Sequence, residues 1–146
     1  VQNWGWFRPE DSEGTFDQAL QNAKDYIKLH REAAIELKKP MVMEEFGVAR
    51  DGGSFDPTAP CDWRDKFYAY YYQVVEEDIQ HNGPIKGINF WSYAGEGRPV
   101  QPGAFWKEGE TFIGDPSHEL QGWYSVYDHD TATLNIIQNF GLAINQ

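Results

Sequence analysis

A short apolar run between a long helical pattern and two acidic residues constrains the fold of this chain most. Lys38-Lys39-Pro40 ends the helical pattern, Met41-Val42-Met43 follows, and Glu44-Glu45-Phe46-Gly47 closes the run. This order of helix, strand, carboxylate and loop is typical of a parallel α/β protein, in which both faces of a strand are covered. An ionised side chain at the end of such a strand must be paired or functional, although exit of the strand into solvent explains the two acids equally well.

Helical and extended patterns alternate along the whole chain. Thr15, with Gln18 three residues later, has the pattern of a capping box, and apolar residues at helical spacing then continue to about Lys38. Asp62 is a predicted N-cap of a second helix, whose tyrosines at 70–72 are expected to pack inside.

The second half of the chain repeats this alternation. Gly83-Pro84 stops the second helix, and residues 85–93 form a second predicted strand. A segment rich in glycine and proline reaches to about Gly122, and a last helix is expected over 131–140. Two parallel strands do not make a stable sheet by themselves, so we expect the chain to be part of a larger domain.

Composition excludes several classes of partner. The 146 residues carry 23 acidic and 12 basic side chains, a net charge of −11, so nucleic acid is not an expected partner. No run approaches the roughly 18 apolar residues that a membrane-spanning helix needs, so no membrane partner is expected. The single cysteine, Cys61, has no second cysteine or histidine pair around it, so we expect no metal site.

Several motifs together resemble glycoside hydrolase family 5. The sequence from Lys39 to Gly47 is similar to the seventh-strand signature of that family, and Gly87-Ile88-Asn89-Phe90-Trp91 is similar to its eighth strand. Asn3-Trp4-Gly5-Trp6, the segment 95–99 and the segment 121–128 resemble its endo-β-1,4-mannanase branch. The resemblance implies an α/β fold, namely the C-terminal part of a (β/α)₈ TIM barrel with about strands 7 and 8 and their flanking helices.

The resemblance also implies how the domain is divided. Residues 1–146 would be the C-terminal segment of a single catalytic domain whose N-terminal strands are absent from this chain. The N-terminal part of the same barrel would then be a partner. The family is secreted, so a secreted or periplasmic location is expected.

The catalytic assignment follows from the same resemblance. The glutamate before the aromatic-glycine pair is the family's nucleophile, so this role falls on Glu45 and not on Glu44. Strand geometry agrees, because neighbouring side chains on a regular strand point to opposite faces and only one would face the cleft. The family's acid/base glutamate follows the fourth strand, which this chain lacks, so we expect the chain alone to be inactive. Two carboxylates supply all the chemistry, so no cofactor is expected.

Three residues are candidates for binding substrate. Trp91 matches the eighth-strand tryptophan that forms the floor of the sugar site, although a tryptophan of the barrel core is the alternative. Trp4 matches a cleft tryptophan of the loop after the sixth strand, or it only anchors that loop. Arg98 can donate to sugar hydroxyls, and a structural ion pair with Glu96 is an equal alternative.

Other aromatic and histidine side chains rank below these candidates. Trp106, His118, Trp123 and Tyr124 are expected to be loop-packing residues, and His118 and His129 to be solvated.

The predicted function is therefore that of a retaining endo-β-1,4-mannanase, which acts on β-mannan polysaccharides or manno-oligosaccharides. A cellulase of the same family is the alternative within the enzyme class. A non-catalytic carbohydrate-binding module is the alternative outside it, and it would be an antiparallel β-sandwich with little helix.

Overall fold

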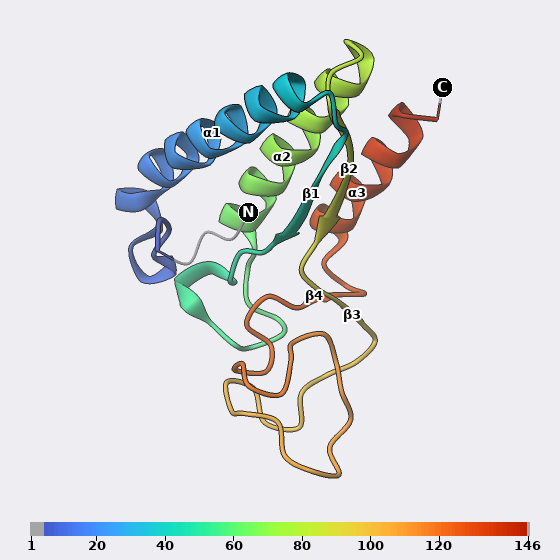
Figure 1. The fold of residues 1–146 in the computed structure, drawn as a ribbon. Helices are drawn as coiled ribbons and strands as arrows, with labels where there is room; N and C mark the ends of the chain where they lie inside the picture. The colour runs from blue at the N-terminus through green and yellow to red at the C-terminus, as the bar shows by residue number, and fades with distance from the viewer. Residues whose placement is uncertain (1–4, 146) are drawn as a thin grey trace.

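The structure, a computed structural model, describes residues 5–145 and contains three long helices and four strands (Figure 1). In chain order the elements are η1 (Pro9–Asp11), α1 (Ser12–Leu37), β1 (Met41–Phe46), η2 (Asp51–Gly53), α2 (Asp62–Gln80), β2 (Ile85–Phe90), β3 (Tyr93–Gly95), β4 (Val126–Tyr127) and α3 (Thr131–Ala143). The predicted alternation of helices and strands is confirmed, and the last helix extends beyond the predicted residue 140.

The strands form two small parallel sheets. β1 pairs with β2, with Met41 opposite Ile85 and Phe46 opposite Phe90. This pairing confirms the predicted parallel α/β class. β3 pairs with β4 in a second sheet, which the sequence did not predict because β4 has two residues and lies outside any apolar run.

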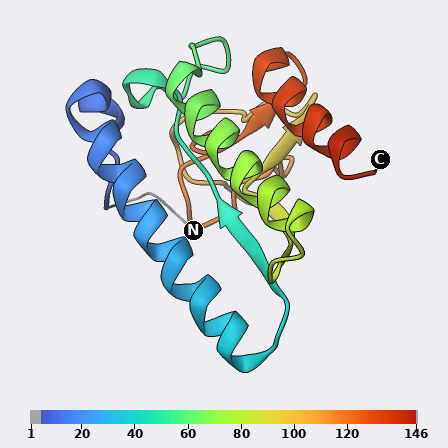
Figure 2. The same cartoon turned by 90° about the horizontal axis from the view of Figure 1, so that it is seen from above.

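The three helices lie side by side in the order α1, α2, α3 on one face of the β1–β2 sheet (Figures 1 and 2). Aromatic rings of α2 fill the space beneath the sheet, and Phe46 of β1 packs against Tyr68 and Tyr71 with ring centroids 4.9 Å apart. Tyr71 and Tyr72 are buried, as predicted, whereas Tyr70 is half-buried.

The opposite face of the β1–β2 sheet is open. Val42 and Gly87 approach one another on this face, and the side chain of Val42 is 46% exposed. The next residues on the same face, Glu44 and Asn89, are also exposed. A parallel sheet normally has both faces covered. Among the described residues, no layer covers this face of β1 and β2.

The helix N-termini differ from the predictions. α1 begins at Ser12, three residues before the predicted cap, and Thr15 lies inside the helix, where its hydroxyl donates to the carbonyl oxygen of Asp11. The predicted capping box was therefore wrong, because Thr15 bonds to the backbone of the preceding turn. In α2 the first residue is Asp62 itself, and the carboxylate of Asp51 accepts from the backbone N–H groups of Asp62 and Trp63.

A buried ion cluster ties the loop after β1 to α2 and to the start of α3. Both oxygens of Asp130 accept hydrogen bonds from Arg50, at 2.6 and 2.9 Å, and one also accepts from Arg64 at 3.3 Å. The same oxygen accepts from the backbone N–H of Tyr127. Arg50 and Arg64 are 1% and 0% exposed, so Asp130 neutralises charge in a place that water does not reach.

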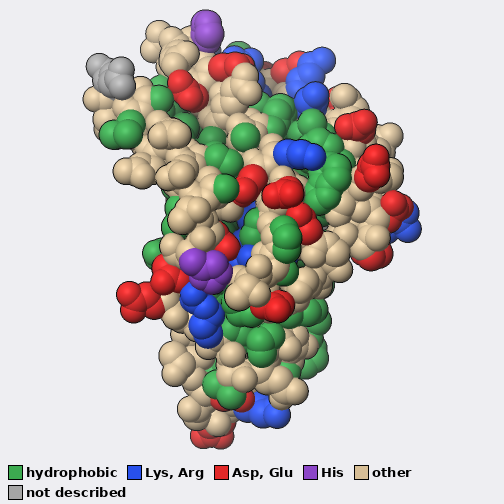
Figure 3. Space-filling model, turned by 180° about the vertical axis from the view of Figure 1, so that it is seen from behind, with side chains coloured by type: hydrophobic (Ala, Val, Ile, Leu, Met, Phe, Trp, Pro, Cys, Tyr) green, Lys and Arg blue, Asp and Glu red, His purple; other side chains and the backbone are tan. Residues whose placement is uncertain are grey.

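The outer surface carries hydrophobic side chains between charged ones, as the view from behind shows (Figure 3). Leu29 and Leu37 of α1 and Leu142 of α3 are among the exposed hydrophobic residues. None of the helices in residues 5–145 is both long and apolar enough to cross a membrane.

Replacement of Asp130 tests the buried cluster. We expect Asp130→Ala to lower the free energy of unfolding by about 3–5 kcal/mol, because two buried guanidinium groups lose their counter-charge. Urea unfolding measures this loss. Asp128→Ala is the matched control, since the Arg98–Asp128 pair is exposed and such pairs contribute little. Equal effects of the two substitutions would contradict a special role for the cluster.

Candidate active site

Loops gather at the carboxyl ends of β1 and β2. The segment after β1 and the long segment from Trp91 to Ser125 both leave the sheet at this end, and the segment after β1 lies next to the start of α1 (Figure 1). Functional residues of parallel α/β barrels collect at this end of the strands, so the candidate site lies there.

Glu45 has an unusual backbone at the end of β1. Its φ is +53°, which is uncommon for a residue other than glycine and is found preferentially at functional sites. The pairing of β1 with β2 is irregular between Met43 and Phe46. The strained backbone therefore coincides with the acidic residue that the sequence predicts to be functional.

This irregularity also changes which faces the two glutamates occupy. Met43 and Phe46 are buried, whereas Glu44 and Glu45 between them are both exposed. Regular alternation would bury one of the two, and the extra residue in β1 leaves both exposed; which of them faces the cleft stays a prediction. Glu44 accepts a hydrogen bond from the side chain of Asn89 on β2 at 3.4 Å.

Trp91 lies beside this bulge. Its backbone N–H donates to the carbonyl oxygen of Phe46 at 2.8 Å, which extends the pairing of β1 and β2 by one residue. The indole is half-buried, and the peptide bond to Ser92 is cis. The structure thus brings together the two residues that rank first from the sequence, Glu45 and Trp91.

Gly47 is needed where the two strands end. A Cβ atom on Gly47 would lie 2.6 Å from the carbonyl oxygen of Trp91 and 3.0 Å from the ring of Tyr124. No side chain fits there without movement of the backbone, so the glycine after Glu45-Phe46 allows Trp91 and Tyr124 to approach the proposed site.

Arg98 has several protein partners. Its guanidinium donates to the carbonyl oxygens of Gly95 and Gly97 and to the carboxylate of Asp128 at 2.6 Å. It also lies 4.4 Å from the ring centroid of Tyr127. Among the described residues its acidic partner is thus Asp128, and the alternative pairing with Glu96 was wrong. A role for Arg98 in binding substrate stays a prediction.

Trp4, the other predicted binding residue, lies outside the described residues. Trp106 packs in its own loop, stacked on Phe112 with its N–H donated to the carbonyl oxygen of Glu110. Trp123 is half-buried and stacks on buried Tyr124, with ring centroids 5.2 Å apart. His118 is exposed.

Asp115 organises the long loop that ends in Trp123 and Tyr124. Its buried carboxylate accepts from the backbone N–H groups of Gly122 and Tyr124 and from the hydroxyl of Ser125. The sequence analysis missed this residue. Asp115 precedes a proline in an irregular segment, and nothing in the local sequence indicates that its carboxylate accepts three hydrogen bonds from residues up to ten positions away.

Glu119 is a second residue that the sequence analysis missed. Burial raises the pKa of its carboxyl group, the carboxylates of Asp115 and Glu45 raise it further, and His118 lowers it. One carboxylate oxygen is buried and has no hydrogen-bond partner among the described residues. Glu119 is therefore a carboxyl group that the charge of Glu45 reaches.

The carboxylates of the site are not arranged as metal ligands. Within the part of the chain that the structure describes, no group of three or more histidine, cysteine, aspartate or glutamate side chains could hold a metal ion.

Comparisons with known proteins agree with the geometry. A family model described as GH family 5 beta-mannosidase-like matches residues 1–146. The mannan endo-1,4-beta-mannosidase 5 of Arabidopsis thaliana is 29% identical over 93 residues, which is 63% of this chain and 20% of that protein.

Solved structures show a related fold. The crystal structure of a glycoside hydrolase family 5 mannosidase from Rhizomucor miehei has a TM-score of 0.87 and 32% identity, and the match covers 99% of this chain and 36% of that one. The endo-beta-1,4-mannanase from Thermotoga petrophila, 17% identical with a TM-score of 0.52, matches the whole chain and 25% of its own, and shows the fold alone.

These relatives are TIM-barrel enzymes, and the structure fits a fragment of such a barrel. The chain spans about a fifth of the curated relative and about a third of the Rhizomucor miehei structure. Because the family model covers all 146 residues, the chain belongs to glycoside hydrolase family 5, in its beta-mannosidase-like group.

Proposed function

We propose that this chain supplies the nucleophile half of the active site of a retaining glycoside hydrolase that cleaves β-1,4-linked mannans. The observation that carries the proposal is the juxtaposition at the carboxyl ends of β1 and β2. Exposed Glu45, with its left-handed backbone, lies one residue before Phe46, whose carbonyl oxygen accepts from Trp91.

The chain would be the C-terminal segment of one (β/α)₈ catalytic domain, with β1 and β2 as strands 7 and 8. The open sheet face at Val42, Glu44 and Asn89 supports this assignment, because in a closed barrel it would face the packed interior. The N-terminal part of the same barrel would cover it. A secreted or periplasmic location remains a proposal from the family resemblance.

The proposed reaction takes place in two steps. A carboxylate oxygen of Glu45 attacks the anomeric carbon of the mannosyl unit, the glycosidic bond breaks, and an acid protonates the departing oxygen. In the second step the same acid, now a base, takes a proton from water, which attacks the anomeric carbon and releases Glu45. Two inversions retain the configuration.

The acid/base residue would come from the N-terminal part of the barrel. A retaining pair needs two carboxyl groups about 5–5.5 Å apart, and we assign the second to a segment outside this chain. The chain alone would therefore not catalyse hydrolysis. Turnover by the isolated chain would contradict this division and would make Glu119 the candidate acid, because it lies near Glu45 and its pKa is raised by burial.

Trp91 would form the floor of the sugar site. The C–H face of a pyranose packs on a flat aromatic ring that also excludes water. Trp91 suits this role because it is half-buried and its backbone bonds to Phe46, the residue after Glu45. Arg98 would act indirectly, because its guanidinium already has backbone and carboxylate partners.

Endo-acting cleavage is the first candidate and removal of terminal mannose is the second. The Arabidopsis relative is called an endo-mannosidase, whereas the family model and the Rhizomucor miehei structure are called mannosidase without that prefix. Product analysis on mannan separates them, because endo-cleavage yields oligosaccharides and terminal cleavage yields mannose. Hydrolysis of β-1,4-glucan instead would favour the cellulase alternative.

A carbohydrate-binding module fits the structure poorly. Its antiparallel sandwich would have little helix, whereas residues 5–145 pair parallel strands and contain three long helices.

Replacement of Glu45 in the complete barrel tests the nucleophile. We expect Glu45→Gln to abolish hydrolysis of mannan, because a neutral amide cannot form the glycosyl ester, while binding of manno-oligosaccharides persists. Reducing-sugar release and calorimetric titration measure the two properties. Glu44→Gln is the matched control, exposed on the same bulge, and should keep most turnover. Normal turnover by Glu45→Gln would remove Glu45 from this role.

Removal of the Trp91 ring tests the sugar site. Trp91→Ala should weaken binding of manno-oligosaccharides by about 1–3 kcal/mol, the scale for burial of one large apolar side chain. Titration with the hydrolysis-deficient Glu45→Gln background measures the loss, and Trp106→Ala serves as the control tryptophan. Unchanged affinity would return Trp91 to a packing role.

The pKa of Glu119 predicts a pH dependence of stability. A carboxyl pKa raised above its ordinary value of 4.5 means that the folded protein holds the proton to higher pH than the unfolded chain. Ionisation then costs stability as pH rises above that value. Glu119→Gln should therefore be more stable than wild type at pH 7 and similar to it at pH 4, as thermal unfolding at both pH values would show. A constant difference would contradict the raised pKa.

A further inference from the structure

His129 lies in the turn before α3 and touches two other loops. The sequence predicts a solvated histidine, and its side chain is exposed. Both ring nitrogens nevertheless have protein partners. Nε2 lies 2.7 Å from the carbonyl oxygen of Pro57, in the segment after β1, and Nδ1 lies 2.7 Å from the guanidinium of Arg98, in the loop after β3. His129 therefore bridges two segments that are far apart in the chain.

The partners of His129 determine its protonation state. A carbonyl oxygen can only accept a hydrogen bond, and a guanidinium can only donate one. Nε2 must therefore carry the proton that is donated to Pro57, and Nδ1 must be the unprotonated acceptor for Arg98. This geometry requires the neutral imidazole, because an imidazolium has a donor at each nitrogen and no acceptor.

His30 and His81 have the opposite arrangement. In each of them Nδ1 faces a backbone carbonyl oxygen, that of Tyr26 at 2.8 Å and that of Glu77 at 2.7 Å. Nδ1 is therefore the donor in both rings, and a second proton on Nε2 would leave these bonds intact. A second proton on His129, by contrast, would break the bond from Arg98.

Arg98 depends on His129 for one of its acceptors. Its Nη1 donates to the carbonyl oxygens of Gly95 and Gly97, each at 2.9 Å. Its Nη2 donates to Asp128 at 2.6 Å and to His129. Each of these nitrogens carries two hydrogen atoms, so the four acceptors use all of them. Loss of Nδ1 as an acceptor would leave one N–H of Arg98 unpaired and place two cations side by side.

Charged groups around His129 take part in this balance. Oδ1 of Asp128 lies 3.4 Å from Nδ1, and Oδ1 of Asp130 lies 3.9 Å from Nε2. The hydrogen bond from Arg98 lowers the pKa of the Asp128 carboxyl group, so Asp128 is ionised where an imidazole titrates. A protonated Nδ1 would therefore turn from Arg98 to Asp128. The other ionisable groups that line the same hollow as His129 are Arg50, Cys61, Asp62 and Asp65.

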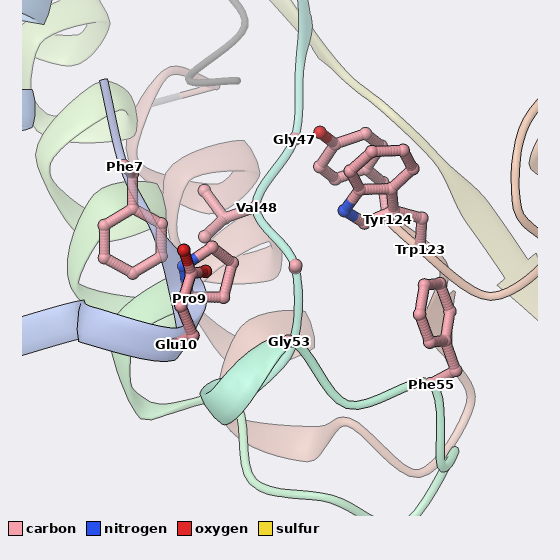
Figure 4. A pocket seen from close by; sticks show the side chains of 10 residues that line it. Phe7, Pro9, Glu10, Gly47, Val48, Gly53, Phe55, Trp123 and Tyr124 are labelled. Atoms are coloured by element: carbon pink, nitrogen blue, oxygen red, sulfur yellow. The ribbon is translucent and has the colours of Figure 1, made fainter. Parts of the chain in front are cut away.

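An apolar contact joins the same part of the molecule beside this bridge. Phe55, two residues before Pro57, meets Trp123 edge to face with ring centroids 6.5 Å apart (Figure 4). A Cβ on Gly103 would lie 3.0 Å from the ring of Phe55. These ring contacts do not titrate, whereas the bridge through His129 does.

We propose that His129 is a pH-sensitive latch between the segment after β1 and the loop after β3. The neutral imidazole joins Pro57 to Arg98, and a proton on Nδ1 releases Arg98 and favours a contact with Asp128. The latch holds the two loops together at neutral pH and loosens their junction in acid. It goes beyond the proposed function and does not rest on it, because it needs no substrate.

Nuclear magnetic resonance of the complete barrel with ¹⁵N-labelled histidine tests the latch directly. At pH 8 we expect the proton of His129 on Nε2 and none on Nδ1, whereas His30 and His81 should carry theirs on Nδ1. The spectrum of His129→Gln identifies the signals of His129. Acidification should add a proton at Nδ1. A proton on Nδ1 at pH 8, or none before the protein unfolds in acid, would overturn the latch.

A double-mutant cycle measures the coupling of His129 to Arg98. At pH 8 we expect Arg98→Ala to lower the midpoint of thermal unfolding more in wild type than in the His129→Ala background, because the two residues share a hydrogen bond. Below the pH at which Nδ1 takes its proton, this difference should vanish or change sign. The same difference at both pH values would overturn the latch. His118→Ala is the control, an exposed histidine that should not couple to Arg98.

A side chain that does not titrate completes the test. His129→Gln offers an amide donor and an amide acceptor but gains no proton in acid. Its coupling to Arg98 should therefore be the same above and below the titration of His129. A pH dependence that persists in His129→Gln would assign the effect to another group and overturn the latch. If Arg98→Ala does not fold, Arg98→Lys replaces it in the cycle.

Discussion

The pairing of β1 with β2 beyond their regular ends is the constraint on which the rest of the site depends. The hydrogen bond from Trp91 to the carbonyl oxygen of Phe46 holds the two strand ends together after the bulge at Glu45. Through it, the residue after the proposed nucleophile is bonded to the proposed sugar platform. Gly47 makes the arrangement sterically possible, because any Cβ there would meet the Trp91 carbonyl oxygen.

Two buried aspartates then hold the loops around these strand ends. Asp130 binds Arg50 and Arg64 and so fixes the segment after β1 against α2 and α3. Asp115 gathers three donors of the segment that ends in Trp123 and Tyr124. Site residues therefore sit on loops that are held by buried charge and hydrogen bonds, which is what positioning of a catalytic group requires.

The sequence predicts the elements well because the signals for them are local. Helical periodicity gave α1, α2 and α3, the Gly83-Pro84 stop preceded β2, and the Glu45-Phe46-Gly47 motif pointed to the end of β1. The bulge in β1 was not predictable, because the alternation of apolar and polar residues in a strand of six residues does not reveal one extra residue in its pairing with β2. The partners of Asp130 and Asp115 were also hidden. Asp130 lies at a helix start, where a side-chain cap is the local expectation, but its carboxylate binds arginines 66 and 80 residues away.

Chemical trapping of the glycosyl intermediate tests whether Glu45 is the nucleophile. A 2-deoxy-2-fluoro-β-mannosyl fluoride forms the ester with the nucleophile in a retaining enzyme, and the fluorine at C2 slows its hydrolysis. Incubation of the complete barrel followed by peptide mass mapping would locate the label. We expect a single fluoromannosyl group on Glu45. A label on Glu44 or Glu119, or turnover of the reagent with inversion at the anomeric carbon, would contradict it.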